Sequence, residues 1–170
     1  DYWLCKLDTS GNLIWQKTYG GTKDELAYTV KQAKDSSYVI VGYTLSNDGD
    51  VGAQNHSYKN DIWVVRADKN GNLLWSKTLG GIANDYSNSF MQTSDKGYLI
   101  IGYTESYDGD VYGNYGQDDL WAIKLDSTGA IQWQKTFGGT DNDRANFAAE
   151  TSDGGFVITG HSESDDIDLS

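Results

Sequence analysis

The chain has 170 residues, of which 38% are hydrophobic and 13% aromatic, and it carries a formal net charge of −12. This composition is sufficient for a packed core, and no apolar run approaches the ~20 residues that a membrane span requires. Phosphate contacts need clustered Lys and Arg, whereas the 13 basic residues here are scattered. We therefore expect neither a nucleic-acid partner nor insertion into a membrane.

The first segment, 1–21, recurs at 61–81 and 119–139, and the three copies align without a gap. A repeat of about 60 residues indicates one supersecondary unit per repeat, whose apolar face is buried against its neighbours. We expect the tryptophans, two per copy, to be structural and to pack between units. They are Trp3, Trp15, Trp63, Trp75, Trp121 and Trp133.

Within 1–21, Asp8 and Gly11 predict a tight turn between two strands. Cys5 is the only cysteine, so it has no disulfide partner in the chain. It lies in the apolar pattern of the first strand, and we expect it in the core. The closing pair Gly20-Gly21 predicts positive φ or a close backbone approach.

A whole unit contains four short stretches with strand character, and none shows a sustained helical period. In the middle unit these stretches are 86–93, 97–104, 119–126 and 130–137. The sequence therefore predicts an all-β fold. Four antiparallel strands per unit, stacked face to face, describe the blades of a β-propeller. The alternative is a β-solenoid, whose coils would show a shorter period of about 20 residues.

Acidic loops follow the second strand of the first two units, as Asp48-Gly49-Asp50 and Asp108-Gly109-Asp110. Two carboxylates separated by a glycine can turn several oxygens toward one hard cation such as calcium. The alternative is a plain β-turn, which favours Asp and Gly for backbone reasons. Asp48, Asp50, Asp108 and Asp110 are therefore candidate calcium ligands, and calcium is the one cofactor that the sequence suggests.

The same loops carry aromatic and amide side chains, which suit sugar rings and their hydroxyl groups. Exposed tyrosines can equally be ordinary packing at the edge of a unit. If they bind a ligand, the partner would be a glycan or a surface protein. The candidate residues are Tyr107, Tyr112, Asn114, Tyr115 and Gln117, with Tyr58 in the first loop.

The pattern Leu-Asp-x-x-Gly-x-x-x-Trp, present at 7–15 and 125–133, resembles the blade motif of quinoprotein-type (PQQ-like) propellers. The longer pattern includes Trp-Gln-Lys-Thr-x-Gly-Gly, Gly-Tyr-Thr and Asp-Gly-Asp-Val. It is similar to the tandem repeats of large secreted bacterial surface proteins, many of them exported by the type IX route. The resemblance covers essentially the whole chain, and it implies an extracellular or cell-surface location.

The resemblance also implies how this single repeat array, 1–170, divides into blades. The third unit is degraded, since Asp165-Asp166-Ile167-Asp168 replaces Asp-Gly-Asp. Because propellers close with ~4–8 blades, we expect the chain to belong to a larger ring, with further repeats or further copies as its partners. The divisions are a C–D half blade (1–21), two whole blades (22–81 and 82–139) and an A–B half blade (140–170).

Catalytic motifs do not emerge from the sequence, and fold does not imply function. Neither His56 nor His161 lies near a nucleophile motif. A single cysteine also cannot supply the adjacent pair that many quinoprotein enzymes contain. We expect a non-catalytic extracellular or cell-surface module for binding, adhesion or display of a protein or carbohydrate ligand. The alternatives are a structural spacer in a long surface protein and, third, a fragment of a quinoprotein-like enzyme.

Overall fold

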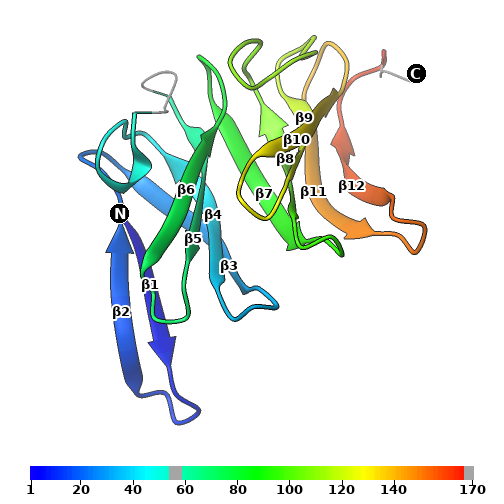
Figure 1. The fold of residues 1–170 in the computed structure, drawn as a ribbon. Coiled ribbons are helices and arrows are strands. Elements are labelled where there is room, and N and C mark those ends of the chain that lie inside the picture. Colours follow the sequence, from blue (N-terminus) through cyan, green and yellow to red (C-terminus); the bar gives the residue numbers. More distant parts are fainter. Residues whose placement is uncertain (54–58, 167–170) are drawn as a thin grey trace.

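The computed structural model describes residues 1–53 and 59–166, and its strands form four antiparallel sheets in succession along the chain (Figure 1). The all-β prediction is confirmed, as is the arrangement of antiparallel strands in sheets of four. In the described part of the chain, no helix is long and apolar enough to cross a membrane. Tyr58 and His56 lie outside the described residues.

We number the sheets 1 to 4 in chain order. Sheets 2 and 3 have four strands each, whereas sheets 1 and 4 have two. Sheet 1 consists of β1 (Tyr2–Leu7) and β2 (Leu13–Tyr19). Sheet 2 consists of β3 (Glu25–Gln32), β4 (Tyr38–Thr44), β5 (Asp61–Ala67) and β6 (Leu73–Leu79), with the short 3₁₀ turn η1 (Gly49–Val51) between β4 and β5. Sheet 3 consists of β7 (Asp85–Gln92), β8 (Tyr98–Thr104), β9 (Asp119–Leu125) and β10 (Ile131–Phe137), and sheet 4 of β11 (Asp143–Glu150) and β12 (Phe156–Ser162).

The core lies between the sheets, which pack face to face as a curved stack (Figure 1). Alternate side chains of a strand point to opposite faces, so each complete sheet contributes to two layers of core. In sheet 2, Trp63 packs toward sheet 1, while its neighbours Ile62 and Val64 pack toward sheet 3. Each repeat therefore buries its apolar side chains only with the help of the repeats beside it.

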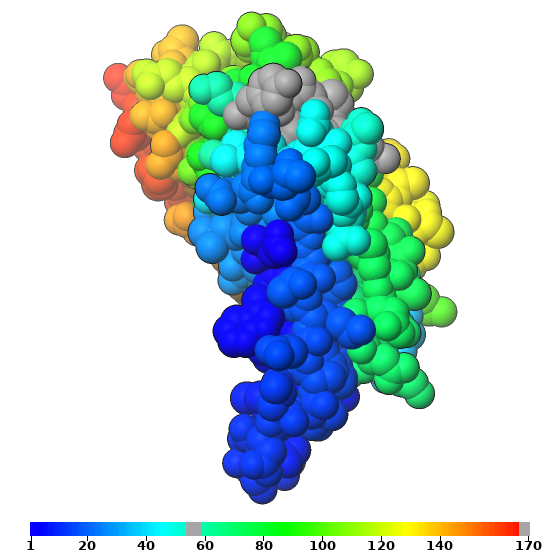
Figure 2. Space-filling model, turned by 90° about the vertical axis from the view of Figure 1, so that its left-hand side faces the viewer, coloured from blue at the N-terminus to red at the C-terminus, as the bar shows by residue number. Residues whose placement is uncertain are grey.

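The first set of tryptophans is buried only where a preceding sheet covers it. Trp63 and Trp121 are 0% exposed, whereas Trp3 is 67% exposed. Cys5 is also exposed, so the prediction that it belongs to the core is wrong. The physical reason is that Trp3 and Cys5 share one face of β1, and no sheet of the described residues lies against that face (Figure 2).

The second set of tryptophans reaches across to the next sheet. Trp75 meets the Tyr98 ring with a centroid separation of 6.3 Å. It also lies over the turn at Gly129, where a Cβ atom would approach its ring to 3.1 Å. Gly129 has φ +89°, so this turn needs glycine both for its backbone and for the indole. Trp15 makes the same contacts with Tyr38 and Gly71 one sheet earlier.

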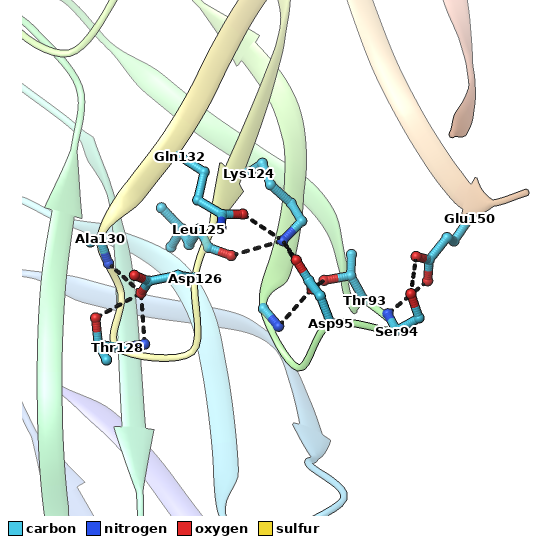
Figure 3. Close-up of polar contacts among 11 residues, drawn as sticks. Thr93, Ser94, Asp95, Lys124, Leu125, Asp126, Thr128, Ala130, Gln132 and Glu150 are labelled. Carbon is cyan, nitrogen blue, oxygen red and sulfur yellow. Dashed lines mark hydrogen bonds and ion pairs between the residues drawn. The ribbon is translucent and has the colours of Figure 1, made fainter. Parts of the chain in front are cut away.

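An ion pair joins neighbouring strands at the β-hairpin end of each complete sheet, and Figure 3 shows the one in sheet 3. In sheet 3, the ammonium of Lys124 lies 2.8 Å from Oδ2 of Asp95 and also donates to Gln132 and to the Leu125 carbonyl. In sheet 2, Arg66 pairs with Asp35 in the same way. The strand pairs β4–β5 and β8–β9 are equivalent, so this ion pair is a repeated feature. In each complete sheet it joins the turn between the first and second strands to the third strand.

Candidate functional site

The acidic loops lie at the opposite end of the sheets, and their first carboxylates accept hydrogen bonds from the backbone. Asp48 accepts from the Thr22 amide at 2.8 Å, and Asp108 accepts from the Ile82 amide at 2.9 Å. Asp166 in the degraded third copy accepts from the Thr140 amide at 3.0 Å. Each of these carboxylates fixes the loop to the Gly-Gly connection that enters its own sheet.

The rest of each acidic loop has the geometry of a turn. Gly49 and Gly109 have φ of +60° and +66°, and Asp110 N donates to the Gly80 carbonyl at 2.9 Å. The valine that follows, Val51 or Val111, is buried between sheets and anchors the loop. Among the described residues, no group of three or more His, Cys, Asp or Glu side chains is placed to hold a metal ion. These observations account for Asp, Gly and Val by backbone and packing needs.

Calcium binding by the loops stays a prediction that melting experiments can test. A ligand that binds only the folded state adds about 2.7 kcal/mol to stability at a hundredfold excess over its Kd. If Asp108 and Asp110 ligate calcium, the melting temperature rises with calcium, magnesium substitutes poorly, and Asp108→Asn with Asp110→Asn abolishes the response of that loop. A melting temperature indifferent to calcium from micromolar to millimolar would identify the loops as turns only.

The Gly-Gly connections are bordered by buried carboxylates that sequence reasoning missed. Asp85 is 0% exposed and accepts hydrogen bonds from Ser106 Oγ at 2.8 Å, from Gly81 N at 2.9 Å and from Thr104. Burial raises the pKa of Asp85 to about 6, against the lowering effect of these hydrogen bonds. Asp85 is the first residue of β7 in sheet 3, and Glu25 and Asp143 occupy the same position at the start of sheets 2 and 4. An acid four residues after each Gly-Gly pair was the available signal.

The loop between β8 and β9 presents the three tyrosines that the sequence singled out. Tyr107, Tyr112 and Tyr115 are 70%, 71% and 76% exposed. The loop itself is held in place, because Asn114 donates to the carbonyls of Thr104 and Ser106 at 3.2 and 3.0 Å. Asn114 therefore serves as an anchor of the loop in this structure, and the tyrosine rings are displayed on a fixed backbone.

Gln117, the fifth candidate, lines a polar hollow beside this loop. The hollow has a volume of about 410 Å³, and its other lining residues are Glu105, Asp118, Asn142 and Arg144. Arg144 donates to Asp118 from Nε at 2.6 Å and again from Nη2, so its guanidinium is held in one orientation. The hollow thus combines carboxylates, amides and a guanidinium contributed by sheet 3 and sheet 4.

A row of aromatic rings on the first two strands of sheets 2 and 3 leads to the same hollow. Arg144 lies 4.5 Å from the centroid of the Tyr103 ring, which is 5.2 Å from the Tyr86 ring. Tyr43 continues the row at 5.9 Å from Tyr86, and Tyr28 follows at 5.8 Å. Sequence reasoning missed this row, although the Gly-Tyr-Thr repeat marks Tyr43 and Tyr103 as equivalent positions.

Comparison with known proteins shows a distant similarity. Over 164 residues, the chain is 26% identical to the regulatory protein FlaEY of Caulobacter vibrioides. The match covers 91% of this chain and 17% of the length of that protein. No protein-family model matches the chain.

Proposed function

We propose that the chain is a run of β-propeller blades from an extracellular or cell-surface protein and that it binds or displays a carbohydrate ligand without catalysis. The observation that carries this proposal is the polar hollow of Gln117, Asp118 and Arg144, which adjoins the row of tyrosines and the displayed tyrosine loop. The stacked four-stranded sheets and the repeat period support the propeller architecture. The regulatory designation of the C. vibrioides relative makes a regulatory role a second candidate.

The chemistry of the hollow suits sugar hydroxyl groups, each of which both donates and accepts hydrogen bonds. Glu105 offers an acceptor, Arg144 offers donors, and the amide of Gln117 offers both. Tyrosine rings add flat apolar faces for the C–H surface of a sugar. Arg144 is already hydrogen-bonded to Asp118 and stacked on Tyr103. Its side chain would therefore lose little conformational entropy when a ligand binds.

Titration of the chain with a panel of oligosaccharides tests this proposal. For a bound oligosaccharide, we expect Gln117→Ala and Arg144→Met each to raise Kd by about tenfold, the loss of about 1.4 kcal/mol. Asn70→Ala is the matched control, since Asn70 is an exposed residue in the β5–β6 turn at the other end of the sheet. Failure of every oligosaccharide to bind would favour the structural spacer, and release of a cleaved product would favour an enzyme.

A further inference from the structure

The two ends of the stack expose side chains that are buried in the middle. On β1, Trp3 and Leu7 are 67% and 55% exposed, while Trp63 and Ala67 at the same positions of β5 are 0% exposed. On β12, Val157 is 53% exposed, while its equivalent Val39 on β4 is 1% exposed. The apolar pattern of a covered sheet therefore persists on both end faces.

The two end sheets are complementary halves. Sheet 4 contains equivalents of the first two strands of a complete sheet, and sheet 1 contains equivalents of the last two. In sheets 2 and 3 the second strand pairs with the third, placing Gly42 opposite Trp63 and Gly102 opposite Trp121. The same register would place Gly160 of β12 opposite Trp3 of β1, and Ile158 opposite Cys5.

A hollow is present where that register would put the indole of Trp3. It has a volume of about 210 Å³ and is lined by Leu120, Phe137 and Gly160, among others. In the complete interface between sheets 2 and 3, the equivalents of Leu120 and Phe137 are Ile62 and Leu79, and they share a core cluster with Trp121. Phe137 is 45% exposed, whereas Leu79 is 0% exposed. The hollow thus has the apolar walls and the glycine that accompany a buried tryptophan.

Charge is complementary at the same two edges. The ion pairs Asp35–Arg66 and Asp95–Lys124 each join a β-hairpin to the next strand. Their equivalents at the ends of the stack are Asp153, in the β11–β12 turn, and Lys6, on β1. Asp153 already accepts a hydrogen bond from Gly155 N, as Asp95 does from Gly97 N. The Asp153 carboxylate is therefore oriented as the Asp95 carboxylate is in sheet 3. Lys6 on β1 of a second copy would supply the cation that Lys124 supplies there.

We propose that a second copy of this chain binds head to tail, with β12 of one copy pairing with β1 of the other. Trp3 then fills the hollow at Leu120 and Phe137, and Lys6 pairs with Asp153. Each copy supplies two whole sheets and two halves, so two copies joined at both ends make six sheets, within the ~4–8 blades that close a propeller. This proposal does not rest on the carbohydrate ligand, although Arg144 lines both hollows, and its tests therefore change Trp3, Cys5 and Ile158 and leave Arg144 in place.

Disulfide cross-linking tests the register. Ile158→Cys places a thiol opposite the native Cys5 of the second copy, on the same face, so mild oxidation should give a reducible dimer that Cys5→Ser abolishes. Val157→Cys is the matched control, because its side chain is one residue away, 53% exposed, and on the opposite face. Equal cross-linking of both variants, or of neither, would overturn the register. A ladder of trimers and longer species would overturn closure by two copies.

Removal of the tryptophan tests the hollow. Because Trp3 is exposed in the single chain, Trp3→Ala should leave that chain folded while raising the dimer Kd by about 30-fold or more, as loss of a central interface tryptophan does. Tyr115→Ala removes an equally exposed ring from the loop end and should leave the Kd unchanged. A dimer indifferent to Trp3→Ala, measured by sedimentation over a concentration series, would refute the proposal.

Discussion

Trp121→Ala should destabilise the chain by about 3–5 kcal/mol, the cost of truncating a large aromatic side chain in a core. Trp121 is 0% exposed between sheets 2 and 3, and its indole N–H donates to Gln134 Oε1 at 2.8 Å. The substitution removes the indole from the central core layer and leaves a cavity that the rigid sheets on both sides close only in part.

Chemical denaturation of Trp121→Ala beside Tyr112→Ala measures this effect. Tyr112 lies in the loop that follows β8 and is 71% exposed, so its truncation should change stability by less than about 0.5 kcal/mol. Equal losses for the two variants would show that the inter-sheet layer is not the main core of the chain.

Asp85→Asn should stabilise the chain at neutral pH and remove a pH dependence between about 4 and 6. The pKa of Asp85 is raised by burial to about 6 in the folded chain, above the value of about 3.9 for an unfolded Asp. The contribution of the Asp85 carboxyl to the free energy of unfolding is therefore fully present below pH ~3.9, where the group is protonated in both states. It is lost as the pH rises through ~6, because the buried carboxyl must then ionise. The shift corresponds to at most about 3 kcal/mol.

Denaturation midpoints of the wild-type chain and Asp85→Asn across pH 4 to 8 test this prediction. The two curves should converge at the acid end, and the variant should be the more stable at the neutral end. Asp126→Asn is the control, since Asp126 is only partly buried at its turn and hydrogen bonds from Thr128 lower its pKa. Parallel curves for wild type and Asp85→Asn over the whole range would contradict a buried, titrating carboxylate.

Much of the fold was predictable because the repeat displays the same constraints three times. The four strands of a unit, their antiparallel order and the turn at Asp8 all follow from local patterns, and Asp8 accepts from the amides of Ser10 and Asn12 at 2.8 Å. The Gly-Gly pair was predicted less completely. Gly80 does not have a positive φ. Glycine is needed there because a Cβ atom would lie within 2.7 Å of the carboxylate oxygens of Asp61 and Asp85.

The candidate site was predictable only in part, because it is assembled from segments far apart in the sequence. Local composition identified the tyrosine loop, but Gln117 meets Asn142 and Arg144 only when sheet 4 stacks on sheet 3. The exposure of Trp3 is likewise a property of its neighbours, since the same residue type at Trp63 is buried. The sequence repeat shows which side chains recur, whereas their burial depends on which sheets stack against them.

Sedimentation equilibrium of the 170-residue chain tests most directly whether its sheets are blades of a ring shared by two copies. We expect a single species of twice the 18.8 kDa chain mass, and a shift toward the single-chain mass for Trp3→Ala. A wild-type chain that stays at 18.8 kDa at all concentrations, with its end faces uncovered, would contradict it.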